Sequence, residues 1–187
     1  MKTFIVHSLR YCMLLLLLSL SLAACGVSLI APCDSVEPLD QFPLESVVIK
    51  APGGNYPFTL WVAHTAARRS QGLMHVRRLE ADRGMLFLFD QPTRPAMWMK
   101  NMAIPLDLLF ISVDGKILHV ARNVTANSQQ IIQPDDAITG VIELPGGTAT
   151  RLNLETGGEI RHAHFVRKAR ETLSSSTNKL RYQLARN

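Results

Sequence analysis

Five side chains between residues 98 and 143 could together bind a ligand: Trp98, Lys100, Asn101, Asp107 and Glu143. An indole ring offers a flat stacking surface, and a lysine can hold an anionic or carbonyl group at the wall of a pocket. Lys100 and Asn101 stand among apolar residues, so they would need polar partners if they were buried, and Asp107 and Glu143 are the natural candidates. The pattern predicts either an ion pair that fixes strand register or a polar cleft that binds a small molecule.

Two other kinds of chemistry are open in the same region. Asp107 and Glu143 could serve as the carboxylate pair of an enzyme acting on envelope material, which requires both groups in one open cavity. Met97, Met99 and Met102 could instead offer soft thioether ligands to Cu(I) in an exported protein. Methionine also fills irregular apolar gaps, and an ordinary core is the favoured interpretation of these residues.

The remaining polar residues give weaker indications. His162 and His164 lie two residues apart and are expected as an exposed pair on a strand, with no third metal ligand nearby. Arginine pairs at residues 68–69 and 77–78 are expected to form a solvated face or, alternatively, an anion clamp. Signatures of a serine or cysteine nucleophile and of a glycine-rich phosphate loop are absent, and no motif implies a cofactor. The sequence therefore favours a binding or accessory module and leaves open whether any reaction is catalysed.

The first 24 residues have the pattern of an export signal. Lys2 and Arg10 give a positive start, and the apolar stretch 11–22 is too short to cross the hydrocarbon core of a bilayer as a helix. The following string Leu22-Ala23-Ala24-Cys25 resembles the lipobox of bacterial lipoproteins, in which the cysteine becomes the first residue and is acylated. The chain is therefore predicted to be held in the cell envelope by acyl chains on Cys25, at the periplasmic face of the outer membrane if the host has two membranes.

The charge is unevenly distributed along the 187 residues. Residues 1–24 carry +2, residues 25–160 carry −3 and residues 161–187 carry +6, which together give the net charge of +5. The body lacks the basic surface that nucleic-acid binding requires. The basic tail, residues 167–187, is predicted to be a frayed helix or disordered, and it could bind anionic lipid or an anionic envelope polymer.

Between the leader and the tail, the chain divides into a tether and one domain. Residues 25–45 contain scattered prolines and no periodicity, which is typical of a flexible tether. Residues 46–166 contain short β-branched or alternating apolar runs, separated by turn residues, with short helices at 66–71 and 148–154. Asp114-Gly115 predicts a hairpin with a two-residue turn. The prediction is a mainly β, jelly-roll-like sandwich or barrel of about eight strands, the predicted strands being 47–49, 58–63, 85–89, 97–102, 106–113, 116–120, 138–144 and 159–165.

Several motifs in this body occur in a familiar order: Gly72-Leu73-Met74, Gly84-Met85-Leu86-Phe87, Trp98-Met99-Lys100-Asn101, Ile104-Pro105-Leu106-Asp107 and Glu143-Leu144-Pro145-Gly146-Gly147. With this spacing, residues 47–162 resemble the prokaryotic family catalogued as domain of unknown function 192. The resemblance implies a compact jelly-roll-like β-sandwich with a small helix, and it implies no activity. The chain departs from the family pattern at Met97, at Met102 and at Gly157-Gly158, where a Gly-Asp pair is usual.

Overall fold

The computed structural model describes residues 36–184 and residue 186. The predicted export signal, the lipid attachment at Cys25 and the first part of the predicted tether lie outside these residues. The described chain forms the following elements, in order: η1 (Leu39–Gln41, a 3-10 helix), β1 (Leu44–Ala51), β2 (Gly54–Ala63), α2 (Ala66–Gln71), β3 (Arg83–Thr93), β4 (Leu106–Ile111), β5 (Ile117–Val124), β6 (Ile138–Pro145), α3 (Thr148–Arg151), β7 (Glu159–Arg161) and α4 (Ala163–Leu184).

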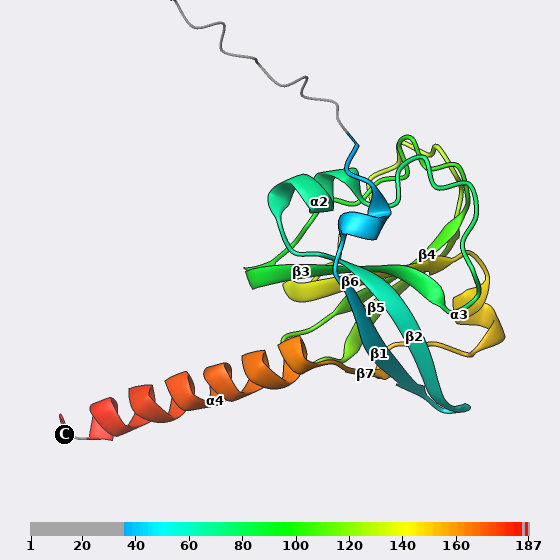
Figure 1. The fold of residues 1–187 in the computed structure, drawn as a ribbon. Coiled ribbons are helices and arrows are strands. Elements are labelled where there is room, and N and C mark those ends of the chain that lie inside the picture. Colours follow the sequence, from blue (N-terminus) through cyan, green and yellow to red (C-terminus); the bar gives the residue numbers. More distant parts are fainter. Residues whose placement is uncertain (1–35, 185, 187) are drawn as a thin grey trace, which may run out of the picture. The chain divides into compact units, whose positions relative to one another are not determined.

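The seven strands form one sheet in the order β5-β4-β6-β3-β2-β1-β7 (Figure 1). Neighbouring strands run antiparallel except β2 and β3, which are parallel and are connected through α2. Strands β4 and β6 are buried along almost their whole length, as expected for central strands that are covered on both faces. The predicted fold class, mainly β and barrel- or sandwich-like with short helices, is confirmed.

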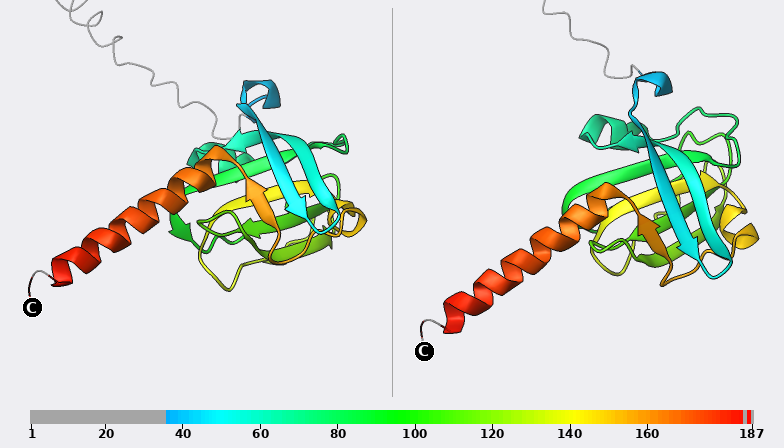
Figure 2. Two further views of the ribbon diagram at one scale, coloured as in Figure 1. Left: turned by 90° about the horizontal axis from the view of Figure 1, so that it is seen from below. Right: turned by 60° about the horizontal axis from the view of Figure 1, so that its bottom comes forward.

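The sheet curls into a half-barrel, so that its edge strands approach each other (Figure 2). Lys116, just before β5, forms an isolated antiparallel bridge with Glu159 of β7. The backbone N–H of Ile117 also donates to the carbonyl oxygen of Gly158 at 2.8 Å. These contacts satisfy backbone groups that an open sheet edge would leave unpaired.

Two apolar cores lie on the two faces of this sheet. The first fills the inside of the curl, because every strand contributes to it, from Val47 on β1 to Ile160 on β7, together with Phe165 of α4. The second covers the outer face of β3, β4 and β6 and includes Phe42 and Leu73 from the segments packed over that face. Met97, Met99 and Met102 of the 97–102 segment belong to this outer layer.

The short helices follow their sequence signals. Helix α2 spans the predicted residues, the Thr65 side chain accepts a hydrogen bond from the Arg68 N–H at 3.2 Å, and Gly72 ends the helix with φ 53°. Helix α3 is shorter than predicted and ends at Arg151.

The β4–β5 hairpin forms at Asp114-Gly115, but its loop differs from the predicted two-residue turn. The Ser112 N–H donates to the Lys116 carbonyl at 2.9 Å, so three residues lie between them. Of these, Gly115 alone has a positive φ, 84°. This is the pattern of a three-residue hairpin loop with a glycine in the left-handed position. Glycine is also required sterically, because a Cβ at residue 115 would lie 2.8 Å from the Ile160 carbonyl oxygen.

The structure differs from the predicted domain, residues 46–166, at both ends. Phe42, expected in the tether, is buried in the outer core, and β1 begins at Leu44. At the other end, β7 has three residues, and the expected strand gives way to α4 at Ala163 because Phe165 enters the inner core from the first helical turn. Helix α4 then extends away from the sheet (Figure 1).

Candidate functional site

A cleft of about 270 Å³ lies over the outer face of the sheet, beside α2. Its floor includes Phe87 and Phe89 of β3 and Glu143 of β6, and one wall is the last turn of α2. The opposite wall is the 95–98 segment, which ends at Trp98. The complete lining is Ala66, Arg69, Ser70, Gln71, Gly72, Met74, Phe87, Phe89, Pro95, Ala96, Met97, Trp98, Met102 and Glu143. Most of these side chains are apolar, so a ligand would be held mainly by burial of its own apolar surface.

Glu143 is the polar group that distinguishes this cleft. It is 1% exposed, and its Oε2 atom has no hydrogen-bond partner among the described residues. Strand β6 lies between β3 and β4, and the positions that pair with Glu143 are Met85 and Leu108. Burial among such neighbours disfavours the charged form and raises the pKa of Glu143 to about 8. At neutral pH the carboxyl is therefore protonated, and it can donate a hydrogen bond.

The backbone around Glu143 is closely packed. At Gly84 of β3, a Cβ would overlap the carbonyl oxygen of Glu143, so only glycine allows the two strands this approach. The Gly84-Met85-Leu86-Phe87 motif thus fits β3 against β6 and places Phe87 on the cleft floor.

Arg69 lines the cleft, and its guanidinium already has hydrogen-bond partners within the protein. Its Nη1 donates to the carbonyl oxygens of His64 at 2.7 Å and Leu88 at 3.0 Å. The guanidinium also lies over the Phe89 ring, 5.1 Å from its centroid. Arg69 therefore ties α2 to β3 and offers less to a ligand than a free arginine would.

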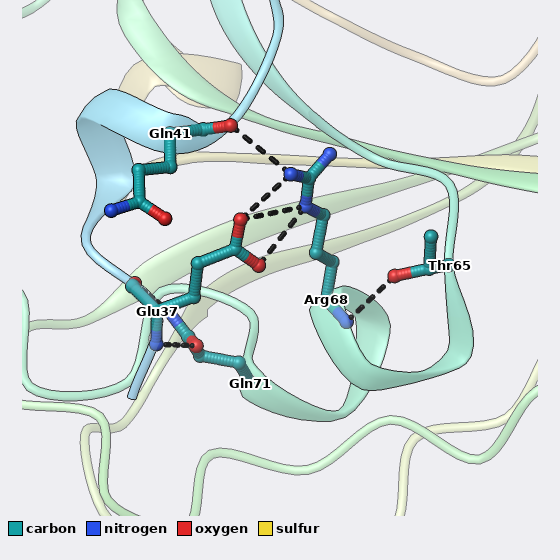
Figure 3. Close-up of polar contacts among 5 residues, drawn as sticks. All are labelled: Glu37, Gln41, Thr65, Arg68 and Gln71. Carbon is teal, nitrogen blue, oxygen red and sulfur yellow. Dashed lines mark hydrogen bonds and ion pairs between the residues drawn. The ribbon is translucent and has the colours of Figure 1, made fainter. Parts of the chain in front are cut away.

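The other side of α2 is fastened to the N-terminal segment (Figure 3). The Glu37 N–H donates to Gln71 Oε1 and Gln71 Nε2 donates to the Glu37 carbonyl, both at 2.7 Å. The Arg68 Nη2 lies 2.7 Å from Glu37 Oε1 and also donates to the Gln41 carbonyl at 3.1 Å. Hydrogen bonding to Arg68 lowers the pKa of Glu37. The helix that walls the cleft is thus held between this clamp and Arg69.

The 97–102 segment is not the predicted strand. Met97 forms an isolated bridge with Ile132, and the Met102 N–H then donates to the Met99 carbonyl at 3.1 Å, which closes a turn. Asn101 in this turn has φ 62°, a left-handed conformation that asparagine tolerates and a strand does not contain. Alternation of side chains between two faces therefore does not apply to this segment.

The structure separates the five predicted site residues. Trp98, 47% exposed, and buried Glu143 line the cleft. Lys100 and Asn101 are exposed in the turn, and Lys100 forms no ion pair with a described residue. The predicted pairing of Lys100 with Asp107 or Glu143 is wrong, because an exposed lysine is hydrated and needs no buried partner.

Asp107 instead holds the fold together, because both of its carboxylate oxygens accept hydrogen bonds from the backbone. It is fully buried, its Oδ1 accepts the Asn123 N–H at 2.6 Å, and its Oδ2 accepts the Ala149 N–H at 2.6 Å. These bonds join β4, β5 and the first turn of α3. In the register of β4 and β6, Asp107 pairs with Leu144 while Leu108 pairs with Glu143. Adjacent positions on a strand face opposite sides, so Asp107 and Glu143 do not share a cavity, and the predicted carboxylate pair is not formed.

The methionines and histidines also differ from expectation. Met97 and Met102 line the cleft, but Met99 is fully buried and does not reach it, so the three predicted thioether ligands do not meet there. His162 and His164 are buried rather than exposed, and His162 Nε2 lies 2.7 Å from Glu45 Oε2. Within the part of the chain that the structure describes, no group of three or more His, Cys, Asp or Glu side chains is placed to hold a metal ion.

Sequence reasoning missed the contribution of α2 to the site. Arg69, Ser70 and Gln71 line the cleft, although the sequence offers only a solvated face or an anion clamp for the arginines of this helix. The sequence does contain a signal for the cleft itself. Glu143 lies within a run of apolar residues, and an acid at the centre of a buried strand is rare without a partner.

Together, the fold and the cleft define a small, curled β-sheet domain with one buried carboxyl in an apolar cleft on its outer face. Residues 47–162 match the family model DUF192, described as "Uncharacterized ACR". The chain belongs to this family, as its motifs predict. No helix in the described part of the chain has both the length and the apolar character needed to cross a bilayer.

Two solved structures are similar to the chain. A protein from Sinorhizobium meliloti 1021, described as a "putative transcription regulator", is 35% identical, with a TM-score of 0.64 over 66% of this chain and 96% of that one. A protein of unknown function from Novosphingobium aromaticivorans DSM 12444 is 28% identical, with a TM-score of 0.65 over 68% of this chain and 91% of that one. No curated protein matches the chain.

Proposed function

We propose that the protein is a binding module anchored in the cell envelope, and that its cleft takes a small, largely apolar molecule bearing a neutral hydrogen-bond acceptor. Glu143 is the observation that carries this proposal. A protonated carboxyl with an unpartnered oxygen beside an apolar cleft can donate to a carbonyl or ether oxygen of a ligand. Trp98 supplies a half-exposed aromatic surface on which a flat group can stack.

The charges around the cleft favour a neutral ligand. The guanidinium of Arg69 is engaged by two carbonyl oxygens, so an anion would compete with these bonds. A cation would require ionised Glu143, and burial opposes that state. A neutral acceptor uses the proton that Glu143 already holds.

The same geometry favours binding over acid–base catalysis. A carboxylate-pair mechanism needs a second carboxyl across one cavity, and Asp107 lies on the other face of the sheet with both oxygens hydrogen-bonded. Within residues 36–184, no other Asp, Glu or His lines the cleft. Glu143 can therefore hold a ligand by a hydrogen bond, but it has no second acid or base among the described lining residues with which to share a proton transfer.

A thermal-shift screen with small neutral compounds tests the proposal, with each carbonyl compound matched to its hydrocarbon analogue. A ligand that binds the native state raises its stability by RT ln(1 + [L]/Kd). We expect carbonyl compounds to raise Tm below about pH 8 and to lose this effect at higher pH, as Glu143 ionises. Glu143→Gln should keep binding but lose its pH dependence, whereas Glu143→Leu and Trp98→Ala should weaken binding. Hits that bind all variants equally would contradict the assigned site.

The envelope location rests on the sequence and has its own test. The lipobox Leu22-Ala23-Ala24-Cys25 supports acylation of Cys25 after export. Intact-mass spectrometry of protein from the membrane fraction should show a chain that begins at residue 25 and carries added fatty acids. Cys25→Ser should abolish the added mass. An unprocessed amino terminus would contradict the anchor without affecting the cleft.

We also propose that α4 lies on an anionic lipid surface. Val166, Leu173 and Leu184 are 51%, 68% and 70% exposed, and their spacing places them on one helix face. Arg170 and Arg181 lie along one side of that face, and each basic residue near an anionic bilayer contributes about 1 kcal/mol. A protein that begins at residue 36 should sediment with phosphatidylglycerol vesicles more than with phosphatidylcholine vesicles. Glu at both arginine positions should remove this difference, and equal sedimentation of the unsubstituted chain would refute the proposal.

A further inference from the structure

A second, polar pocket of about 350 Å³ lies where three loops meet. Its lining comes from the loop after α2, the 94–105 loop and the loop after β5, and it consists of His75, Arg77, Asn101, Met102, Ala103 and Asn127. Met102 lines both this pocket and the cleft, so the two sites adjoin. None of the lining residues is acidic, whereas four of them carry hydrogen-bond donors.

The backbone holds three of these donors in uncommon conformations. His75, Asn101 and Asn127 have φ values of 66°, 62° and 58°, and each comes from a different loop. The His75 N–H donates to the Asn101 carbonyl at 3.0 Å, which joins two of the loops directly. Residues kept in the left-handed region by their surroundings often mark sites that bind a ligand. Here the three residues with positive φ all line the same pocket. This is a second observation in favour of the site, beside the hydrogen-bond donors of its lining.

Arg77 supplies the charge of this pocket. It is exposed, and it forms no ion pair or side-chain hydrogen bond with another residue of the described chain. This distinguishes it from Arg68, which is bound to Glu37, and from Arg69, which is bound to carbonyl oxygens. A planar guanidinium with an unoccupied fork matches the oxygens of a phosphate or a carboxylate.

From the donor set and the unpaired guanidinium, we infer that the His75–Arg77–Asn101–Asn127 pocket binds a small oxyanion. Arg77 pairs with the oxyanion through its guanidinium fork, while His75 and the two asparagine amides are the further donors in the lining. The inference is independent of the proposed function, because it involves neither Glu143 nor Trp98. It also gives a role to Arg77 of the arginine pair at residues 77–78, for which the sequence leaves a solvated face and an anion clamp open.

Titration with inorganic phosphate at low ionic strength tests this inference on the full-length protein in a nonionic detergent. Isothermal calorimetry should show saturable binding to one site, and the side-chain amide signals of Asn101 and Asn127 should shift in NMR spectra. Arg77→Gln should weaken binding about tenfold, the factor that corresponds to loss of one charge-assisted contact. Arg78→Gln removes the same charge from the neighbouring residue, which does not line the pocket, and should change the affinity less than about twofold.

Each outcome of this experiment is decisive. A selective loss in Arg77→Gln, with amide shifts at both asparagines, supports the site. Equal weakening in the two variants would mean that phosphate responds only to net charge, and it would overturn the inference. The absence of saturable binding to the unsubstituted protein would also overturn it. Because Arg77 is exposed and has no ion-pair partner in the described part of the chain, its replacement should leave Tm unchanged, and a Tm measurement on each variant verifies that the fold is intact.

Discussion

Replacing Glu143 with glutamine removes the ionisable proton of the buried carboxyl, and so measures how much that proton contributes to the free energy of unfolding. Burial raises its pKa from the reference value of 4.5 to about 8. Between these values the unfolded chain releases the proton and the folded protein keeps it. The stabilisation contributed by this proton is therefore complete below about pH 4.5 and is lost as pH rises, by about 1.4 kcal/mol per pH unit, until the folded carboxyl ionises. The total over this window is about 5 kcal/mol, an upper limit because local rearrangement and water entry relieve part of the burial cost.

Glutamine has nearly the same shape but cannot ionise. Any cost of its amide in the apolar surroundings is constant with pH, so the informative quantity is the slope and not the absolute stability. The free energy of unfolding of the native protein, minus that of Glu143→Gln, should fall by about 1.4 kcal/mol per pH unit from about pH 5 to about pH 8 and then level off. Other titrating groups are common to both proteins and cancel in this difference.

Urea unfolding at one-unit steps from about pH 5 to about pH 9 measures this quantity, with m-values compared to verify two-state behaviour. Glu155→Gln makes the same chemical change at an exposed position and controls for the effect of the substitution itself. Parallel stability curves for the native protein and Glu143→Gln would refute the reasoning. They would show that the carboxyl is ionised when folded and finds a partner, and the hydrogen-bond donor of the proposed cleft would be lost.

Three further predictions concern the framework of the site, and urea unfolding measures each. Asp107→Asn should cost about 2–3 kcal/mol, because an amide nitrogen would face one of the two backbone N–H groups that the carboxylate accepts. Thr65→Ala should cost about 1 kcal/mol through loss of the N-cap of α2, and Thr65→Ser should restore most of it. Burial, with nearby cationic side chains, lowers the pKa of His164 below 6.5, so stability should fall as pH drops below that value. His164→Leu should remove this acid-side loss, and an unchanged acid limb would contradict a buried neutral imidazole.

Much of the fold could be predicted because local signals agree with tertiary packing. Thr65 and Gly72 bound a helix in the sequence and cap it in the structure. The continuous apolar run at 85–89 becomes part of β3, the middle strand of the sheet. The resemblance of residues 47–162 to the family gives the same result. Where propensity, capping and burial coincide, sequence alone is sufficient.

The 97–102 segment shows where this agreement ends. Its alternation of methionines with other residues is typical of a strand, but a strand also needs a partner along its length, and here pairing stops after the Met97–Ile132 bridge. Asn101 was the local signal against a strand, since asparagine favours turns and the left-handed region. The segment instead folds as a turn that buries Met99 and Met102 and exposes Lys100. Polar residues of such a segment need no buried partners, which removes the basis of the predicted ion pair.

Asp107 and Glu143, the two acids of the predicted site, have different roles because of the register between β4 and β6. A single sequence does not reveal this register. Because Asp107 stands opposite Leu144 and Glu143 opposite Leu108, the carboxyl groups point to opposite faces of the sheet. On one face, two backbone N–H groups meet Asp107, and the acid joins β4, β5 and α3. On the other face, no donor among the described residues meets Glu143 Oε2, and burial leaves that acid protonated beside the cleft. A buried polar group without a partner costs free energy unless something outside the chain satisfies it, and a ligand acceptor in the cleft would do so.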